Sequence, residues 1–70
     1  MNEHKLISVV IPCLNEEKGI GICIDKARSA LERMGRPYEI VVCDNGSSDR
    51  SREIARSKGA RVIEEPRKGY

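Results

Sequence analysis

Three short apolar runs alternate with two stretches of helical spacing along the chain. The runs at residues 6–11, 38–43 and 60–63 are rich in β-branched residues and apolar at most positions. Such runs are typical of strands inside a parallel sheet, where helices cover both faces. Pro12 ends the first run because it has no N–H to donate to a neighbouring strand. The pattern therefore predicts three short strands, buried on both sides.

The first stretch between these runs has the spacing of an amphipathic helix over residues 16–34. Asn15 offers a side-chain oxygen to cap this helix, and Glu16 and Glu17 bring negative charge to its first turn, where the helix dipole favours it. Gly35 supplies a left-handed position that ends the helix. The apolar stripe expected to face the core is Ile20, Cys23, Ile24, Ala27, Leu31 and Met34.

A second, shorter helix is predicted from residue 48 or 49 to Lys58, and Gly59 ends it. Strands that alternate with helices in the order β-α-β-α-β indicate an α/β fold with a parallel sheet. In such a sheet, the loops that follow the strands lie along one edge, where ligands bind. The loops at residues 12–17 and 44–49 are therefore expected to form the site.

The predicted sheet is too small to be complete. Three strands and two helices leave one edge and one layer of helices missing, so apolar side chains would face water. Seventy residues also allow for no more than one domain. We therefore expect residues 1–70 to be a fragment, the N-terminal part of a larger α/β domain.

The composition is that of a globular protein, with 39% hydrophobic residues. No apolar run approaches the roughly 18 residues of a membrane span, and the N-terminus lacks the order of a signal peptide. We therefore expect a cytoplasmic chain. The cysteines have no paired spacing, so they are expected to be reduced and packed as small apolar residues. They are Cys13, Cys23 and Cys43.

The formal net charge of +2 is unevenly distributed. Residues 1–49 hold 6 basic and 8 acidic side chains, whereas residues 50–70 hold 7 basic and 3 acidic ones. No aromatic residue is interleaved with the basic residues to stack on bases, so nucleic acid is not expected as a partner. A solvated helix face and turn is the favoured interpretation of this basic segment.

The loop at residues 44–49 carries the clearest candidate chemistry. Asp44 places a carboxylate at the end of a strand, where it can accept hydrogen bonds from a base edge or a ribose hydroxyl. Gly46 allows a ligand to approach the backbone closely, and the following amides open a helix, which suits an anion. A capped turn without any ligand explains the same residues equally well.

The loop at residues 12–17 has a second carboxylate. Pro12 sets a rigid turn, after which Glu16 can point at ligand hydroxyls. Helix capping alone would also explain this loop. Taken together, the two loops are more specific than either one, because we expect Glu16 and Asp44 to face a shared hollow.

These residues resemble the family 2 glycosyltransferases of the GT-A fold. The resemblance is carried by residues 8–12 (SVVIP), 15–17 (NEE) and 42–49 (VCDNGSSD), and it covers nearly the whole chain. It implies the start of a Rossmann-like GT-A domain that binds nucleotide sugars. The chain is most similar to the branch that transfers sugars to polyprenyl or dolichyl phosphate, which implies a role in cell wall or glycolipid biosynthesis.

The resemblance also implies roles for individual residues. Pro12, Leu14 and Glu16 match the positions that hold the nucleotide of the sugar donor. Asp44 matches the acid that contacts the base or the ribose. The implied donor is a UDP- or GDP-hexose, and the implied acceptor is a lipid phosphate, which would place a longer parent protein at a membrane.

Three departures limit what this chain can do. Leu14 stands where many members have an aromatic residue, and Asn45 replaces a commonly seen second Asp. The Asp-x-Asp motif that holds Mg or Mn, and the base on the acceptor side, would lie beyond Tyr70. We therefore expect donor recognition by this chain, but no metal ligation and no turnover.

The alternative function is a small non-catalytic α/β module that binds an anionic partner through its basic residues 50–70. The two functions predict different effects of substitution. Asp44→Ala should abolish nucleotide-sugar binding only under the first, whereas charge reversal at Arg52 and Arg56 should matter mainly under the second.

Overall fold

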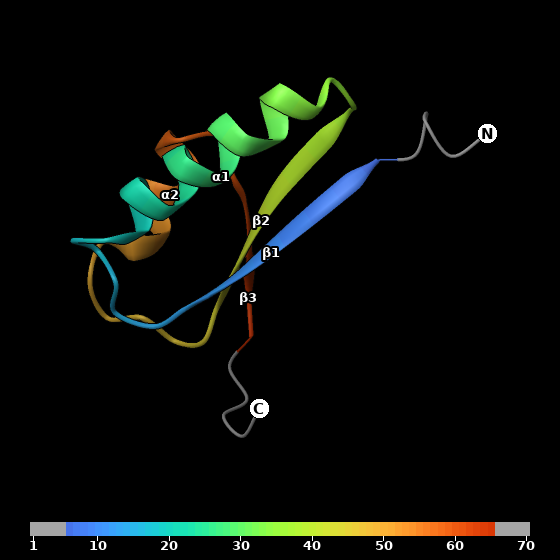
Figure 1. The fold of residues 1–70 in the computed structure, drawn as a ribbon. Helices are drawn as coiled ribbons and strands as arrows, with labels where there is room; N and C mark the ends of the chain where they lie inside the picture. Colours follow the sequence, from blue (N-terminus) through green and yellow to red (C-terminus); the bar gives the residue numbers. More distant parts are fainter. Residues whose placement is uncertain (1–5, 66–70) are drawn as a thin grey trace.

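The computed structural model describes residues 6–65, and it has the predicted order of strands and helices (Figure 1). The elements are β1 (Ile7–Cys13), α1 (Ile20–Met34), β2 (Tyr38–Asp44), α2 (Ser51–Ser57) and β3 (Arg61–Glu64). The predicted α/β fold class is therefore confirmed.

The three strands form one parallel sheet in the order β1-β2-β3. Cys13 at the end of β1 lies in register with Asp44 at the end of β2, and Asp44 with Glu64 of β3. Both crossovers step across the sheet in the same direction, so right-handed connections bring α1 and α2 to the same face (Figure 1). The result is two layers, with the ends of all three strands at one edge.

The core lies between the helices and the sheet. Ile24 of α1, Val42 of β2 and Ala55 of α2 have no exposed surface. Each comes from a different element, so the apolar stripe of α1, the inner face of β2 and one side of α2 pack on one another. The buried members of this cluster are Cys13, Ile20, Ile24, Leu31, Ile40, Val42, Ala55 and Ala60.

The prediction that the strands are covered on both faces is wrong for the two edge strands. The side chains of β1 alternate between half-buried and exposed, with Val10 61% exposed, and three of the four residues of β3 are exposed, Ile63 among them. No helix or strand of residues 6–65 lies on the second face of the sheet (Figure 1). Val41 on that face is nevertheless buried, because β1 and β3 flank the central strand.

The start of α1 also differs from the prediction. The helix begins at Ile20 rather than at residue 16, and its N-cap is Gly19. Asn15 has a φ of 52°, in the left-handed region, and its side chain does not cap α1. Glu16 lies in the turn before the helix, where its carbonyl accepts hydrogen bonds from Gly19 and Ile20. The loop after β1 is consequently longer than the hydrophobic spacing indicated.

The two predicted helix ends are confirmed. Gly35 has a φ of 66°, and its N–H donates to the carbonyl of Glu32. Gly59, with a φ of 85°, follows α2 in the same left-handed region. Glycine populates this region at little cost, so both chain reversals fall where the sequence places them.

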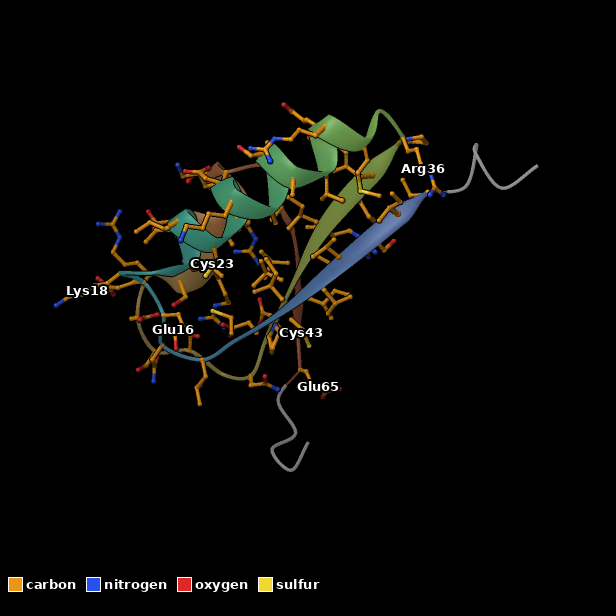
Figure 2. All side chains as sticks on the ribbon, viewed as in Figure 1. Glu16, Lys18, Cys23, Arg36, Cys43 and Glu65 are labelled. Carbon is orange, nitrogen blue, oxygen red and sulfur yellow. The ribbon has the colours of Figure 1, made fainter. Side chains whose placement is uncertain are left out.

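The three cysteines are free, as expected, but only one is fully buried. Cys13 belongs to the core, Cys43 is half-buried and Cys23 is exposed. Met34 is 54% exposed as well, so two members of the predicted stripe of α1 do not face the core. Figure 2 shows Cys23 on the helical layer and Cys43 beside the strands.

Two isoleucines of α1 give a matched test of this packing. We expect Ile24→Ala to lower the free energy of unfolding by about 2–5 kcal/mol, because it leaves a cavity in the core. Ile22, which is 58% exposed, serves as the control, and Ile22→Ala should change stability by less than about 0.5 kcal/mol. Urea denaturation followed by circular dichroism measures both values. Equal losses would contradict this assignment of the helix faces.

Candidate functional site

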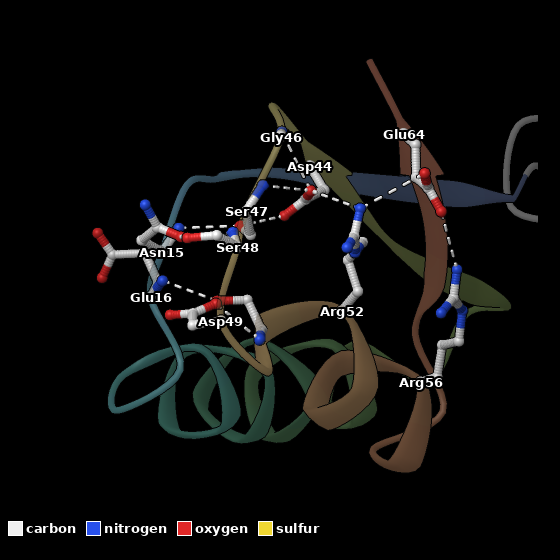
Figure 3. Close-up of polar contacts among 11 residues, drawn as sticks. Asn15, Glu16, Asp44, Gly46, Ser47, Ser48, Asp49, Arg52, Arg56 and Glu64 are labelled. Carbon is white, nitrogen blue, oxygen red and sulfur yellow. Dashed lines mark hydrogen bonds and ion pairs between the residues drawn. The ribbon is translucent and has the colours of Figure 1, made fainter. Parts of the chain in front are cut away.

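The loops that follow β1 and β2 lie side by side and are hydrogen-bonded to each other (Figure 3). The N–H of Asn15 donates to Ser47 Oγ at 2.9 Å, and the Asn15 Oδ1 accepts from the N–H of Ser48 at 2.8 Å. The N–H of Asn45 donates to the carbonyl of Cys13 at 2.9 Å, which continues the sheet pairing into the loops. The sequence prediction that both loops meet at one edge of the sheet is confirmed.

A second set of bonds joins the same loops nearer to α2. The N–H of Glu16 donates to Ser51 Oγ at 2.7 Å, and that of Glu17 donates to Asp49 Oδ2 at 3.1 Å. Asp49 Oδ1 accepts from both the N–H and the hydroxyl of Ser51. These bonds satisfy the turn before α1 with side chains from the other loop. Capping of α1 therefore does not explain the residues of the first loop.

Asp44 is the last residue of β2, and its side chain has no exposed surface. Its Oδ2 accepts hydrogen bonds from the N–H groups of Gly46, at 3.1 Å, and Ser47, at 2.9 Å. Its Oδ1 accepts from the hydroxyl of Ser47. Gly46 has a φ of 104°, which lets the chain turn back over the carboxylate. Asp44 is thus fixed by the residues that directly follow it.

The carboxyl of Asp44 is held in its ionised form. Burial acts to raise its pKa, but the hydrogen bonds from Ser47 and Gly46 and the nearby Arg52 guanidinium outweigh burial. The net result is a pKa below the ordinary value of 3.8. At neutral pH Asp44 therefore accepts hydrogen bonds and donates none.

A cavity of about 190 Å³ opens beside Asp44. Its other lining residues are Gly46, Arg52, Glu64 and Glu65, which bring one guanidinium and two further carboxylates. Arg52 Nη1 lies 3.7 Å from Asp44 Oδ2 and 3.5 Å from Glu64 Oε1, between the ends of β2 and β3 (Figure 3). The site is therefore a polar cavity at the carboxyl ends of two neighbouring strands.

The predicted site residues fall into two groups. Asp44 and Gly46 line the cavity, whereas Pro12, Leu14 and Glu16 do not. In Figure 3, Glu16 lies on the other side of Ser47 and Ser48 from Asp44. The cavity therefore does not unite the two carboxylates in one hollow, although the loops that carry them are bonded together. The reason is that α1 starts late, so that Glu16 belongs to an exposed turn.

Three cavity residues were not among those predicted. Arg52 was assigned to the solvated basic segment, and its side chain is in fact only 33% exposed. Glu64 and Glu65 end β3 and follow it. The rule that ligands bind beyond the carboxyl ends of parallel strands would have found both glutamates, had it been applied to the third strand.

Residues 6–65 do not fit a metal site. No group of three His, Cys, Asp or Glu side chains in this range lies close enough to hold an ion. Neither α1 nor α2, the helices of this range, has the length and apolar composition needed to cross a membrane.

Comparison with known proteins assigns the family. The model of glycosyl transferase family 2 matches residues 8–70. This chain belongs to glycosyl transferase family 2. It is 53% identical over 64 residues to the low-salt glycan biosynthesis hexosyltransferase Agl6 of Haloferax volcanii, a match that covers 91% of this chain and 15% of that protein.

A second relative indicates which branch of family 2 the chain resembles. It is 43% identical over 54 residues to the undecaprenyl-phosphate 4-deoxy-4-formamido-L-arabinose transferase of Pectobacterium carotovorum, covering 77% of this chain and 16% of that one. The chain thus resembles the branch that transfers sugars to polyprenyl phosphate, as its motifs implied. It spans only 15% and 16% of the length of these two relatives.

A solved structure supports the same fold. Glucosyl-3-phosphoglycerate synthase from Mycobacterium tuberculosis, crystallised with Mn²⁺, UDP and glucosyl-3-phosphoglycerate, matches with a TM-score of 0.72 and 38% identity. The match covers 86% of this chain and 21% of that one. The family 2 chain therefore has the start of a Rossmann-like GT-A domain.

Ser47 and Ser48 give a matched test of the bonds between the loops. We expect Ser47→Ala to lower the free energy of unfolding by about 1–3 kcal/mol, because the hydroxyl bonds both the buried Asp44 and the Asn15 N–H. The exposed hydroxyl of Ser48 makes one long contact of 3.4 Å, so Ser48→Ala should cost less than about 0.5 kcal/mol. Urea denaturation measures both. A smaller effect at Ser47 than at Ser48 would contradict the described junction.

The lowered pKa of Asp44 also predicts how stability depends on pH. A carboxyl with a lower pKa in the folded than in the unfolded chain stabilises the fold above its unfolded pKa, here near 3.8, and loses this effect as the pH falls through the folded pKa. We expect the stability difference between the wild type and Asp44→Asn to shrink between about pH 6 and about pH 2. Urea denaturation across this range measures it, and a constant or growing difference would contradict the pKa direction.

Proposed function

We propose that residues 1–70 form the N-terminal, donor-binding part of a glycosyltransferase. The longer protein would move a hexose from a UDP- or GDP-sugar to an acceptor such as a polyprenyl phosphate. One observation carries the proposal: an ionised carboxylate, that of Asp44, is fixed beside a polar cavity at the carboxyl end of the central strand. This is the place where open parallel sheets bind nucleotides.

Asp44 retains acceptor capacity for a ligand. A carboxylate offers about four acceptor positions, and hydrogen bonds from Gly46 and Ser47 use three of them. The fourth position is on Oδ1, which accepts only from the Ser47 hydroxyl. The carboxylate has no exposed surface in this structure, so an N–H of the base or a hydroxyl of the ribose would complete the set after neighbouring side chains, such as Arg52 at 3.7 Å, move aside.

The first loop, residues 12–17, would add ligand contacts from the other side of the hydrogen bonds that join Asn15 to Ser47 and Ser48. Leu14 is 43% exposed and would offer apolar contact where many family members have an aromatic residue. The Glu16 carboxylate has no hydrogen bond or ion pair within residues 6–65, so it could accept from a ligand hydroxyl. Pro12 would stiffen the approach to this loop, and Gly46 would let the nucleotide come close to the backbone of the second loop.

A divalent metal, Mg or Mn, would act in the longer protein by neutralising the charge of the leaving diphosphate. Its ligands would lie outside the described residues, since these contain no suitable cluster. A lipid-phosphate acceptor would place that protein at a membrane surface. This chain alone would bind the donor nucleotide without turning it over, because residues 6–65 hold no cluster of side chains that could ligate the metal.

The alternative function, a basic module for an anionic partner, has less support. Each basic side chain of residues 50–65 lies within 4 Å of a carboxylate, so its charge is already paired. Arg67 and Lys68 lie outside the described residues. Because Arg52 lines the Asp44 cavity, its charge reversal no longer separates the two functions, and Arg56 becomes the discriminating position.

The test is the binding of UDP-glucose and GDP-mannose by titration calorimetry. We expect Asp44→Asn to weaken the binding of at least one donor by tenfold or more, that is by about 1.4 kcal/mol, since a charged acceptor is lost. Asp25→Asn is the control, because this carboxylate lies on α1, pairs with Lys58 and does not line the Asp44 cavity. It should leave the affinity unchanged.

Two outcomes would contradict the proposal. Equal affinities of the wild type and Asp44→Asn, with both variants folded by circular dichroism, would remove Asp44 from the site. Efficient hexose transfer by the same samples with Mn²⁺ and a polyprenyl phosphate would show that the metal ligands and the base are present in this chain.

A further inference from the structure

Asn15 lies between two residues of the first loop whose side chains are open to a ligand. Leu14 is 43% exposed, and the Glu16 carboxylate makes no hydrogen bond or ion pair within residues 6–65. The side chain of Asn15 differs from both, because its Oδ1 accepts from the N–H of Ser48 at 2.8 Å. Asn15 therefore makes a contact inside the protein, whereas its two neighbours are left for a ligand.

The contact of Asn15 reaches the second loop, residues 44–49, at two consecutive residues (Figure 3). Its N–H donates to Ser47 Oγ at 2.9 Å, and its Oδ1 binds the amide of the next residue. These partners directly follow Gly46, which lines the Asp44 cavity. A single residue thus fixes the first loop to the part of the second loop that borders the cavity.

The backbone of Asn15 restricts which residues can make this contact. Its φ is 52°, and no other residue of the range 6–65 except glycine has a positive φ. Asn and Asp adopt this left-handed region more readily than other L residues do. Glycine would keep the backbone but lose the acceptor, and alanine would lose both. The position therefore favours a residue that combines a left-handed backbone with a side-chain oxygen.

We propose that Asn15 is a positioning residue of the donor site. It holds the first loop against the second, so that Leu14 and Glu16 face the nucleotide from a fixed place relative to the Asp44 cavity. A loop that is ordered before binding raises the affinity, because less conformational entropy is lost when the ligand arrives. The proposal deepens the proposed function and rests on it, since there is nothing to position unless the donor binds here.

Asn15→Gly separates the side-chain contact from the backbone conformation, because glycine adopts the same left-handed φ. Titration calorimetry on the full chain uses UDP and GDP as probes. We expect Asn15→Gly to weaken the binding of the tighter of the two by about three- to tenfold, the effect of one lost hydrogen bond. Asn15→Asp keeps both the acceptor and the backbone preference, so it should remain within about twofold of the wild type.

Ser57→Ala is the matched control. It removes one exposed side-chain hydrogen bond, that of Ser57 Oγ to the carbonyl of Ile54 at 2.7 Å, at the end of α2 that is farther from the second loop. The affinity should be unchanged. An Asn15→Gly variant that binds as tightly as this control would overturn the proposal.

A thermodynamic cycle with Leu14 distinguishes positioning from a general loss of stability. In the wild-type background, Leu14→Ala should weaken nucleotide binding severalfold, because an apolar contact is lost. In the Asn15→Gly background, the same substitution should have less than about a twofold effect, since the loop no longer holds residue 14 at the ligand. A purely structural role of Asn15 would leave the effect of Leu14→Ala the same in both backgrounds, and this would overturn the proposal. Circular dichroism checks each fold, and if Asn15→Gly does not fold, Asn15→Ser, whose hydroxyl is one atom shorter, takes its place.

Backbone order without nucleotide gives a measure that is independent of donor binding. Relaxation of ¹⁵N nuclei should give the amide of Leu14 an order parameter of about 0.85 in the wild type and a clearly lower one in Asn15→Gly. Equal values would overturn the role of Asn15 but leave donor binding intact. A wild type that binds neither UDP nor GDP would overturn the proposed function and the role of Asn15 together.

Discussion

The hydroxyl of Ser47 is the interaction on which the site depends. It is buried, donates to the Asp44 carboxylate and accepts from the N–H of Asn15. One side chain thus fixes the acid at the end of β2 and also bonds the loop that follows β1. Since an unpaired buried polar group is costly, each of these bonds supports the other. This shared oxygen therefore helps to keep Asp44 ionised, together with the N–H groups of Ser47 and Gly46 and the Arg52 guanidinium, and it is one of the bonds that join the two loops.

The direction of the crossovers is the second constraint. Both steps from strand to strand run the same way across the sheet, so right-handed connections place α1 and α2 on one face. This brings the ends of β1, β2 and β3 to one edge and makes the site possible. It also leaves Val10 and Ile63, on the second face, 61% and 43% exposed. The same topology therefore builds the site and leaves an apolar surface uncovered.

Patterns in the sequence correctly predicted those features of the fold that depend on neighbouring residues or on the general geometry of parallel sheets. The strands, the glycine ends at Gly35 and Gly59, and the meeting of the two loops follow from apolar runs, left-handed residues and the geometry of parallel sheets. The start of α1 could not be predicted in this way, because Asn15 bonds Ser48 in the other loop rather than its own helix. The partner that overrides the local capping preference is more than thirty residues away in the chain.

Arg52 is a functional-site residue that local sequence patterns could not predict either. In the sequence it is one of several basic residues on a short helix, and a solvated position is the simplest interpretation of it. Only the fold reveals that this side chain stands between Asp44 and Glu64, at the ends of two different strands. A cavity with carboxylates alone would accept hydrogen bonds but offer none to a carbonyl oxygen. The one anchored guanidinium among them gives the cavity a side-chain hydrogen-bond donor as well as acceptors.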